Sequence, residues 1–416
     1  MTMGPSLGER DPDIKRIIES EERRQRGSID LIASENHTSR AVMEASSCVM
    51  TNKYAEGYPG RRYYSGCEHV DEAESLAIER AKRLFGAEHA NVQPHSGSQA
   101  NIAAFIATIM PGDKVMGLAL DHGGHLSHGS PVNISGRYYE VSSYQVDRDT
   151  EMLNYDAVQK AAEEFRPKLI IAGFSAYSRQ VDFKRFGQIA RSVDAFLLAD
   201  ISHIAGLVAG GVHPSPIEHA DITTTTTHKT LRGPRGALGM TKPELAKKYN
   251  LGVFPRLQGG PLMHTVAAKA VAFHEALQPQ FREYAQQVVE NARAMAAVLA
   301  DGGLRIVSGG TDTHLFAVDL RPAGLTGAEV EDALGQAGIY VNKNVIPFDE
   351  QPARIASGIR IGTAAITTRG MGADHARQVA ELILEALKGR DDQSKLDAIR
   401  DKVRGFVGEF PVPGIG

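Results

Sequence analysis

The run Ala195-Phe196-Leu197-Leu198-Ala199-Asp200 constrains the fold of this 416-residue chain more than any other stretch. Five successive apolar residues, with no alternating polar ones, predict a strand that is buried on both faces. Such strands occur in parallel sheets that helices cover on both sides. Strand and helix patterns alternate around this run, for instance at Val115 to Leu120, Tyr155 to Phe165 and Leu169 to Gly173. We therefore predict an α/β protein with a central, mostly parallel sheet.

A second strand leads to a candidate nucleophile. The threonines from Thr223 to Thr227 are β-branched and favour an extended strand, and Gly233-Pro234 ends whatever follows. This strand delivers Lys229 to a turn, beside a histidine and two arginines. A cationic setting lowers the pKa of a lysine and frees its amine to attack a carbonyl. Lys229 is therefore a candidate Schiff-base lysine; taken alone, the segment is equally compatible with a surface lysine in a basic loop.

Three chemically useful side chains follow predicted strands. Asp200 ends the apolar strand, His203 comes shortly after it, and Lys229 follows the threonine strand. Ligands of open α/β sheets bind beyond the carboxyl ends of the strands. We therefore expect an acid, a histidine and a lysine to meet at one edge of the sheet.

The segment from His95 to Asn101 opens an apolar helix with Ser96-Gly97-Ser98. Hydroxyls and free backbone N–H groups at the positive end of a helix suit a phosphate, although the same residues could serve only as a helix N-cap. A lysine that forms an imine, an aspartate and a Ser/Gly phosphate cup are what pyridoxal phosphate requires. We therefore predict this cofactor.

Three histidines gather in the glycine-rich loop from His122 to Gly129. They could bind a metal, but the ligand spacings of the zinc families are absent. We therefore expect no metal here and prefer a histidine that stacks on the cofactor ring.

Composition narrows the class of protein. The net charge of -4 and the isoelectric point near 6.4 give no reason to expect nucleic acid or an anionic membrane as a partner. The apolar runs are too short to span a membrane, and residues 1–13 lack a signal-peptide pattern. Two cysteines, Cys48 and Cys67, cannot form a disulfide framework. We expect a cytoplasmic protein.

The remaining segments suggest how the chain is divided. An amphipathic N-terminal helix or arm ends near Arg26, and its apolar stripe needs a partner surface. A loop from Asn52 to Gly66 mixes tyrosines and charges with glycine and proline, which indicates a binding loop or an ordinary surface loop. The segment after the long helical zone looks like a smaller α+β domain. We expect an arm at 1–26, a large cofactor domain at 27–280 and a small domain at 281–416.

Motifs in the same order over nearly the whole chain give a specific resemblance. They are Tyr54-Ala55-Glu56-Gly57-Tyr58-Pro59-Gly60, His95 to Asn101, His122 to Gly129, Ser175-Ala176-Tyr177, Thr224 to Gly236, Gln258 to His264 and Ser357 to Thr363. With them the chain resembles serine hydroxymethyltransferases. This resemblance implies a fold-type I pyridoxal phosphate enzyme that exchanges a one-carbon unit between serine and tetrahydrofolate, with glycine as the other product. It also implies a homodimer with shared active sites, or a dimer of dimers.

The resemblance further implies a role for each matching residue. Lys229 would hold the cofactor covalently, Asp200 would pair with the pyridine nitrogen and His125 would stack on the ring. Ser175 and His203 would contact the side of the ring hydroxyl. The phosphate would be held by Ser96, Gly97, Ser98 and His228, with Tyr54, Gly259 and Gly260, of which Tyr54 and Gly260 would come from the neighbouring subunit.

The same resemblance assigns residues to the substrates. Ser34 and Arg360 would bind the substrate carboxylate, for which a guanidinium is suited. Glu56 of the other subunit would move a proton at the serine hydroxyl, with Tyr64 beside it. The expected catalytic set is Lys229, Glu56, His203, Tyr64 and Thr226. Folate would contact Glu56, Tyr63, Leu120, Gly124, Leu126 and Asn344.

Five positions depart from the family pattern, namely Asp121, Ser202, Arg256, Ala237 and Ala365. Ala365 lies where Gly-Thr-Pro-Ala-Ile-Thr is expected, and losing a proline there would loosen the turn near Arg360. The departures keep three readings open: neutral drift within the family, a paralogue acting on α-methylserine as a hydroxymethyltransferase or aldolase, and a non-catalytic homologue.

Overall fold

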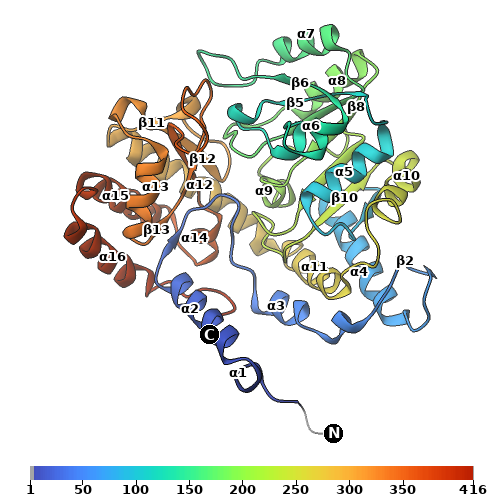
Figure 1. Ribbon diagram of the computed structural model, residues 1–416, viewed down its shortest axis with the longest axis horizontal. Coiled ribbons are helices and arrows are strands. Elements are labelled where there is room, and N and C mark those ends of the chain that lie inside the picture. Colours follow the sequence, from blue (N-terminus) through green and yellow to red (C-terminus); the bar gives the residue numbers. More distant parts are fainter. Residues whose placement is uncertain (1–3, 416) are drawn as a thin grey trace.

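The computed structural model describes residues 4–415, and its larger body is built around a seven-stranded sheet (Figure 1). Its strands, in spatial order, are β4 (His89–Asn91), β10 (Ala237–Thr241), β9 (Ile222–Thr226), β8 (Phe196–Asp200), β7 (Leu169–Gly173), β5 (Lys114–Leu118) and β6 (Glu140–Tyr144). The five strands from β9 to β6 are parallel, while β10 runs antiparallel to both β4 and β9. The predicted mostly parallel sheet is confirmed.

Alternate residues of the central strands enter different cores, which is why the strands read as continuous apolar runs. In β8, Leu198 packs with α5 (Gly97–Thr108) and α10 (Pro243–Val253) on one face. Its neighbours Leu197 and Ala199 pack on the other face. Helices that cover this second face are α4 (Glu68–Phe85), α7 (Tyr155–Phe165), α8 (Phe183–Ser192), α9 (Ala205–Ala209) and α11 (Met263–Ala276).

A second core surrounds an antiparallel sheet in the smaller body, drawn in orange and brown in Figure 1. Its strands, in order, are β11 (Arg305–Ile306), β12 (Leu315–Asp319), β15 (Gly358–Gly362) and β14 (Asn342–Asn344). Helices α13 (Gly327–Gln336), α15 (Ala373–Gly389) and α16 (Gln393–Val407) contribute to this core. The long helix α12 (Pro279–Asp301) packs its first half in the large core and its second half in the small one.

The N-terminal segment lies against the smaller body. Strand β1 (Ile29–Asp30) pairs in parallel with β13 (Ile339–Tyr340), and Ile29 lies in the second core. The Arg369 guanidinium donates to the carbonyls of Ser28 and Phe410, so both chain ends meet there. The expected domain limits of 1–26, 27–280 and 281–416 stay a prediction.

The other elements are short or peripheral. Strands β2 (Gly57–Tyr58) and β3 (Arg61–Arg62) form a hairpin. The remaining helices are α1 (Leu7–Arg10), α2 (Pro12–Arg26), α3 (Arg40–Ser46), α6 (Ile134–Tyr138) and α14 (Ala364–Thr368), with 3-10 turns at Val49–Asn52, Leu120–His122, Leu126–His128, Val307–Gly309 and Arg321–Ala323. Within residues 4–415, no helix is both long and apolar enough to span a membrane.

Candidate active site

A cavity of about 300 Å³ opens at the carboxyl ends of the parallel strands. Asp200 is the last residue of β8, and Lys229 lies just past the end of β9. The cavity is lined by Ser34, Glu35, Ser96, Gly97, Ser98, His125, His128, Phe174, Ser175, Asp200, Ser202, His203, Thr226, His228, Lys229 and Arg235. The expected meeting of acid, histidine and lysine is thus observed.

Lys229 has the surroundings of a reactive amine. The residue is 8% exposed, and its Nζ has no hydrogen bond or ion pair with any residue from 4 to 415. Burial lowers the pKa of Lys229 to about 8, with Asp200 opposing the shift and Arg360 adding to it. About a tenth of the amine is therefore unprotonated at pH 7, far more than for an ordinary lysine.

Asp200 is held as a carboxylate by four hydrogen bonds. Asn101 Nδ2 lies 2.8 Å from Oδ2, and His128 Nε2 lies 3.0 Å from the same oxygen. The Ser202 hydroxyl and the Ser202 backbone N–H donate to Oδ1 at 2.6 and 3.1 Å. Burial alone raises the pKa of Asp200, but the hydrogen bonds and nearby histidines outweigh it, and the net pKa lies below the ordinary value. An anion fixed in this way can keep a pyridine nitrogen protonated.

His203 is paired with a histidine from the smaller body. Its Nδ1 lies 3.3 Å from Nε2 of His314, and both rings are buried. Burial lowers the pKa of both, that of His314 to about 3, with the cations Lys229 and Arg360 adding to the effect. Both rings are therefore neutral, and one nitrogen of the pair carries the proton that the other accepts. His314 thereby constrains the tautomer of His203.

Arg360 is a half-buried cation with no acidic partner among residues 4–415. Its Nη1 donates to the carbonyl of Ser175 at 2.7 Å, and its Nε donates to Asn342 Oδ1 at 3.1 Å. Burial lowers the pKa of Arg360 to about 10. Within residues 4–415 no carboxylate forms an ion pair with it, so the guanidinium is available to an anionic ligand.

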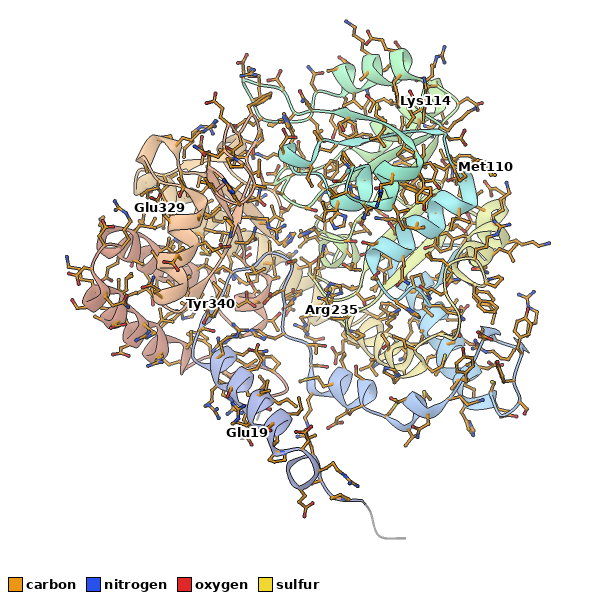
Figure 2. All side chains as sticks on the ribbon, viewed as in Figure 1. Glu19, Met110, Lys114, Arg235, Glu329 and Tyr340 are labelled. Carbon is orange, nitrogen blue, oxygen red and sulfur yellow. The ribbon has the colours of Figure 1, made fainter. Side chains whose placement is uncertain are left out.

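Unpartnered polar atoms test whether pyridoxal phosphate fits this cavity. Of the described residues, none forms a hydrogen bond with the buried Thr226 Oγ1 or His228 Nδ1, and both residues line the cavity. Ser96 is the N-cap of α5, and a Cβ on Gly97 would lie 2.8 Å from the Thr226 methyl group, so glycine keeps the cup open. Arg235, which Figure 2 shows between the two bodies, adds a cation. The residues fit the cofactor.

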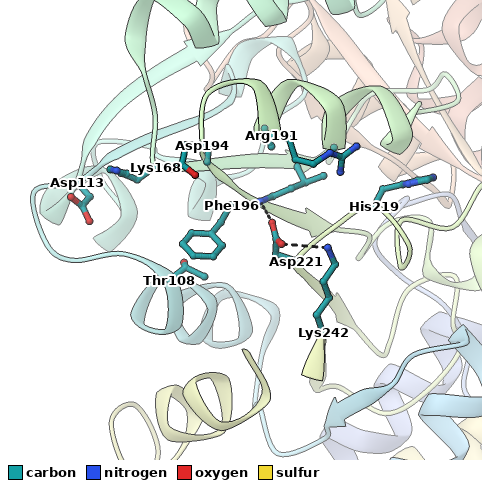
Figure 3. Close-up of a pocket in the computed structure, with 13 residues that line it drawn as sticks. Thr108, Asp113, Lys168, Arg191, Asp194, Phe196, His219, Asp221 and Lys242 are labelled. Atoms are coloured by element: carbon teal, nitrogen blue, oxygen red, sulfur yellow. Dashed lines mark hydrogen bonds and ion pairs between the residues drawn. The ribbon is translucent and has the colours of Figure 1, made fainter. Parts of the chain in front are cut away.

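A larger cavity, about 550 Å³, lies at the opposite ends of the same strands (Figure 3). Phe196 begins β8, and Asp221 directly precedes β9. Asp221 accepts the Leu197 N–H at 2.7 Å and lies 3.6 Å from Lys242 Nζ. The acid is thus already paired, and this end of an α/β sheet is not where ligands normally bind.

Comparison with known proteins agrees with the site. A family model described as serine hydroxymethyltransferase matches residues 7–383. The chain belongs to the serine hydroxymethyltransferase family. A curated protein named serine hydroxymethyltransferase from Acidobacterium capsulatum is 57% identical over 412 residues, which cover 99% of this chain and 96% of that protein. The family membership establishes the predicted fold-type I architecture and pyridoxal phosphate dependence.

The residues expected from the family pattern fall into two groups in this single chain. Eleven of them line the cavity: Ser34, Ser96, Gly97, Ser98, His125, Ser175, Asp200, His203, Thr226, His228 and Lys229. Arg360 reaches the same region through the Ser175 carbonyl. The residues expected from a neighbouring subunit do not line the cavity of their own chain.

This second group gathers on the β2–β3 hairpin and the glycines packed against it. Tyr54 Oη lies 3.4 Å from Glu56 Oε1, and Tyr64 Oη lies 3.4 Å from Oε2. A Cβ on Gly259 would lie 3.2 Å from Glu56, and one on Gly260 would meet the Tyr54 ring. Tyr63 is 72% exposed. Among the residues expected to bind folate, Leu120 and Leu126 are exposed, Gly124 is buried, and Asn344 lines a separate small pocket.

Six residues of the site were missed by reasoning from sequence. Asn101 and His128 bind Asp200, His314 binds His203, and the cavity is also lined by Glu35, Phe174 and Arg235. A signal existed for His128, which lies three residues after His125 in the histidine loop, and for Arg235, which follows Lys229 in the basic turn. Asn101 and His314 had no local signal.

The structure accounts for several departures from the family pattern. Ser202 donates to Asp200 and its Oγ accepts the Thr226 N–H at 3.0 Å. Ala237 is a buried strand residue, where alanine costs less backbone entropy than glycine. Asp121 and Arg256 are exposed, and nothing in the structure explains them.

The proline departure needs a correction of position. Counted from Gly362, the proline of the expected pattern falls on Ala364 rather than Ala365. Ala364 is the first residue of α14, a position that favours proline but does not require it. The helix forms there with alanine, so the segment after Arg360 is not an irregular turn.

Proposed function

We propose that this chain is a pyridoxal-phosphate-dependent hydroxymethyltransferase that interconverts serine and glycine, with tetrahydrofolate as the one-carbon acceptor. The observation that carries the proposal is that the amine of Lys229, which has no hydrogen-bond partner within residues 4–415, shares a cavity with the Asp200 carboxylate, which four hydrogen bonds hold. Family membership along residues 7–383 supports the same activity. The enzyme is a transferase of one-carbon metabolism.

Each cavity residue has a task that its surroundings support. When bound, pyridoxal phosphate supplies a conjugated ring that delocalises the electron pair left on the substrate α-carbon. Lys229 would attach the cofactor, and Asp200 would keep the ring nitrogen protonated. Ser96, Ser98 and His228 would hold the phosphate at the start of α5. His125, whose Nδ1 is fixed by Ser127, lines the same cavity and would pack against the ring.

The amino acid is oriented by its carboxylate. Arg360 is half-buried and forms no ion pair with an acid of the described residues, and a guanidinium binds a carboxylate through two parallel hydrogen bonds. Ser34 lines the cavity and adds a hydroxyl. His203 faces the same space in a neutral form, so it can accept or donate one hydrogen bond without adding charge.

The site is completed by a second copy of the chain. Glu56 and Tyr64 do not line their own cavity, and they lie on an exposed tyrosine-rich hairpin. Helix α2 has no buried residue, and Ile14, Ile17 and Ile18 on it are exposed. Both surfaces suit burial in a homodimer, in which Glu56 would move the proton of the serine hydroxyl in the partner's cavity. Two such dimers could associate further. A cytoplasmic location agrees with the two free cysteines.

The experiment is a substrate panel with the purified enzyme. We expect glycine from L-serine to depend on tetrahydrofolate, and turnover of α-methylserine to be far slower. Preferred turnover of α-methylserine would indicate the paralogue instead, and absence of turnover with every amino acid would contradict the enzymatic proposal. Light scattering should give twice or four times the 44.9 kDa chain mass. A monomer would refute the shared site.

A further inference from the structure

The backbone around Glu56 is held by one buried side chain. Nη1 of Arg62 donates to the carbonyl of Ala55 and to the carbonyl of Gly57, both at 2.9 Å. These are the residues on either side of Glu56. The Glu56 carbonyl itself accepts the Tyr63 N–H at 3.0 Å. All three carbonyls from 55 to 57 are therefore bound within the hairpin.

The remaining nitrogens of Arg62 anchor it to helix α4. Nη2 lies 2.5 Å from Glu74 Oε2, and Nε lies 2.8 Å from Asp71 Oδ1. The other oxygen of Glu74 accepts from Gln93 Nε2, which also donates to the Gly57 carbonyl. The side chains of Arg62 and Glu74 are 3% and 1% exposed. A rigid helix and a strand end thus determine where the hairpin lies.

This arrangement is better suited to holding a position than to gaining stability. Desolvation offsets most of the attraction within a buried ion pair, so apolar residues of similar volume often stabilise a fold equally well. A guanidinium, in contrast, directs five N–H groups in fixed directions. At Arg62, Nη1 alone reaches both carbonyls that flank Glu56.

The Glu56 carboxylate has only weak support of its own. Its two hydrogen bonds, with Tyr54 and Tyr64, are long at 3.4 Å, and both tyrosines are exposed. The place of the carboxylate is therefore determined mainly by the backbone. We propose that Arg62 is a positioning residue that fixes the Glu56 carboxylate for proton transfer, without itself touching substrate or cofactor. The inference rests on the proposed function of Glu56.

The test compares Arg62→Lys with Arg61→Lys, a control on the exposed neighbouring side chain of the same hairpin. Lysine keeps the charge next to Glu74 but cannot reach both carbonyls. We expect kcat for serine with tetrahydrofolate to fall about 10- to 100-fold in Arg62→Lys, because small misplacement of a catalytic group has effects of this size. Cofactor absorbance and serine affinity should stay within about twofold of wild type, as should every parameter of Arg61→Lys.

A double variant separates positioning from a structural role. If Arg62 acts through Glu56, then Arg62→Lys combined with Glu56→Gln should be no slower than Glu56→Gln alone. The inference would be overturned if the losses in kcat of the two single variants multiplied in the double variant, or if Arg62→Lys alone kept wild-type turnover. If Arg62→Lys does not fold, the double variant Arg62→Met with Glu74→Met removes both charges together. The same measurements are then made on that variant.

The inference and the proposed function can fail separately. If the wild-type enzyme shows no turnover, the proposed function is rejected. The positioning role of Arg62 can then still be tested by crystallography. In that case the Arg62→Lys structure should show the Ala55 and Gly57 carbonyls displaced and the Glu56 carboxylate moved. Unchanged positions would reject the inference whatever the activity.

Discussion

Two buried lysines lie close to the active site, and they differ in what surrounds their ammonium groups. Lys229 has no hydrogen-bond partner within residues 4–415 and borders the cavity. Lys269, on α11, is 1% exposed and donates to the carbonyls of Val92, Pro94 and Ala237 at 2.7, 3.0 and 2.8 Å. Burial lowers the pKa of both lysines.

The difference shows that burial alone does not identify a nucleophile. An ammonium group has three N–H donors, and the three carbonyls around Lys269 use all of them. Lys269 thereby connects the segment that follows β4, which leads to the phosphate cup, with the first residue of β10. Lys229 keeps its donors and its amine free for a ligand.

Replacing Lys229 with methionine tests whether this lysine, of the two, is the catalytic one. We expect serine turnover to fall by at least about 10³-fold, because no other group can attach the cofactor. Thermal stability of the cofactor-free protein should not fall, since no hydrogen bond of the ammonium group within residues 4–415 is lost. Borohydride reduction followed by peptide mass mapping checks the assignment: wild type should carry the cofactor on Lys229, and label on another lysine would refute it.

Replacing Lys269 with methionine tests whether this lysine serves the stability of the fold. The side-chain volume is nearly kept, but buried carbonyls lose their donor, so we expect a loss of about 2–4 kcal/mol in the free energy of unfolding. Urea denaturation measures this loss. Lys247→Met, on the exposed face of α10, is the matched control and should change stability by less than about 0.5 kcal/mol. Equal stability of the two variants would contradict the structural role.

The pH dependence of labelling should sharpen the contrast. The pKa of Lys229 is lowered to about 8, so its reactive unprotonated fraction rises with pH up to about 8 and then levels off. Below that pH, reductive methylation of Lys229 in the cofactor-free enzyme should slow by about tenfold per pH unit. Lys269 should stay unlabelled as long as the protein is folded. Mass spectrometry distinguishes the two sites, and equal labelling would remove the distinction.

Ala237→Gly should give the smallest effect and tests the surroundings of Lys269. Glycine is the residue expected there from the family pattern, but it increases the backbone entropy lost in a strand, so we expect a destabilisation of about 0.5–1 kcal/mol. Turnover should stay within about twofold, because the carbonyl that Lys269 binds remains. A gain in stability would show that the alanine is strained in β10.

The sequence predicted those parts of the fold that depend on local patterns. The apolar run before Asp200 became β8, and the threonine strand became β9, because burial on both faces leaves a readable signature in a few residues. Strand β1 was not predicted, because two residues are too few to show the alternating hydrophobic pattern of a strand. Its partner β13 lies about three hundred residues away in the chain.

The site was predictable to the same extent. Lys229 and Asp200 could be placed because strand ends of parallel sheets converge at one edge. Asn101 and His314 act through contacts with residues 99 and 111 positions away, which no local pattern encodes. The role of Arg62 depends on helix α4 and Gln93, so it too becomes visible only in three dimensions.

The pairing of β1 with β13 also sets an order of events during synthesis. The segment that follows β1 carries Ser34 and then Asn36, whose side chain donates to the Lys229 carbonyl. Its anchor in the smaller body is made of residues near positions 340, 369 and 410. A chain still growing on the ribosome contains all seven strands of its large sheet before residues 339–340 exist, so β1 can pair only after most of the chain has been made. The segment that carries Ser34 and Asn36 therefore gains this anchor only late in translation.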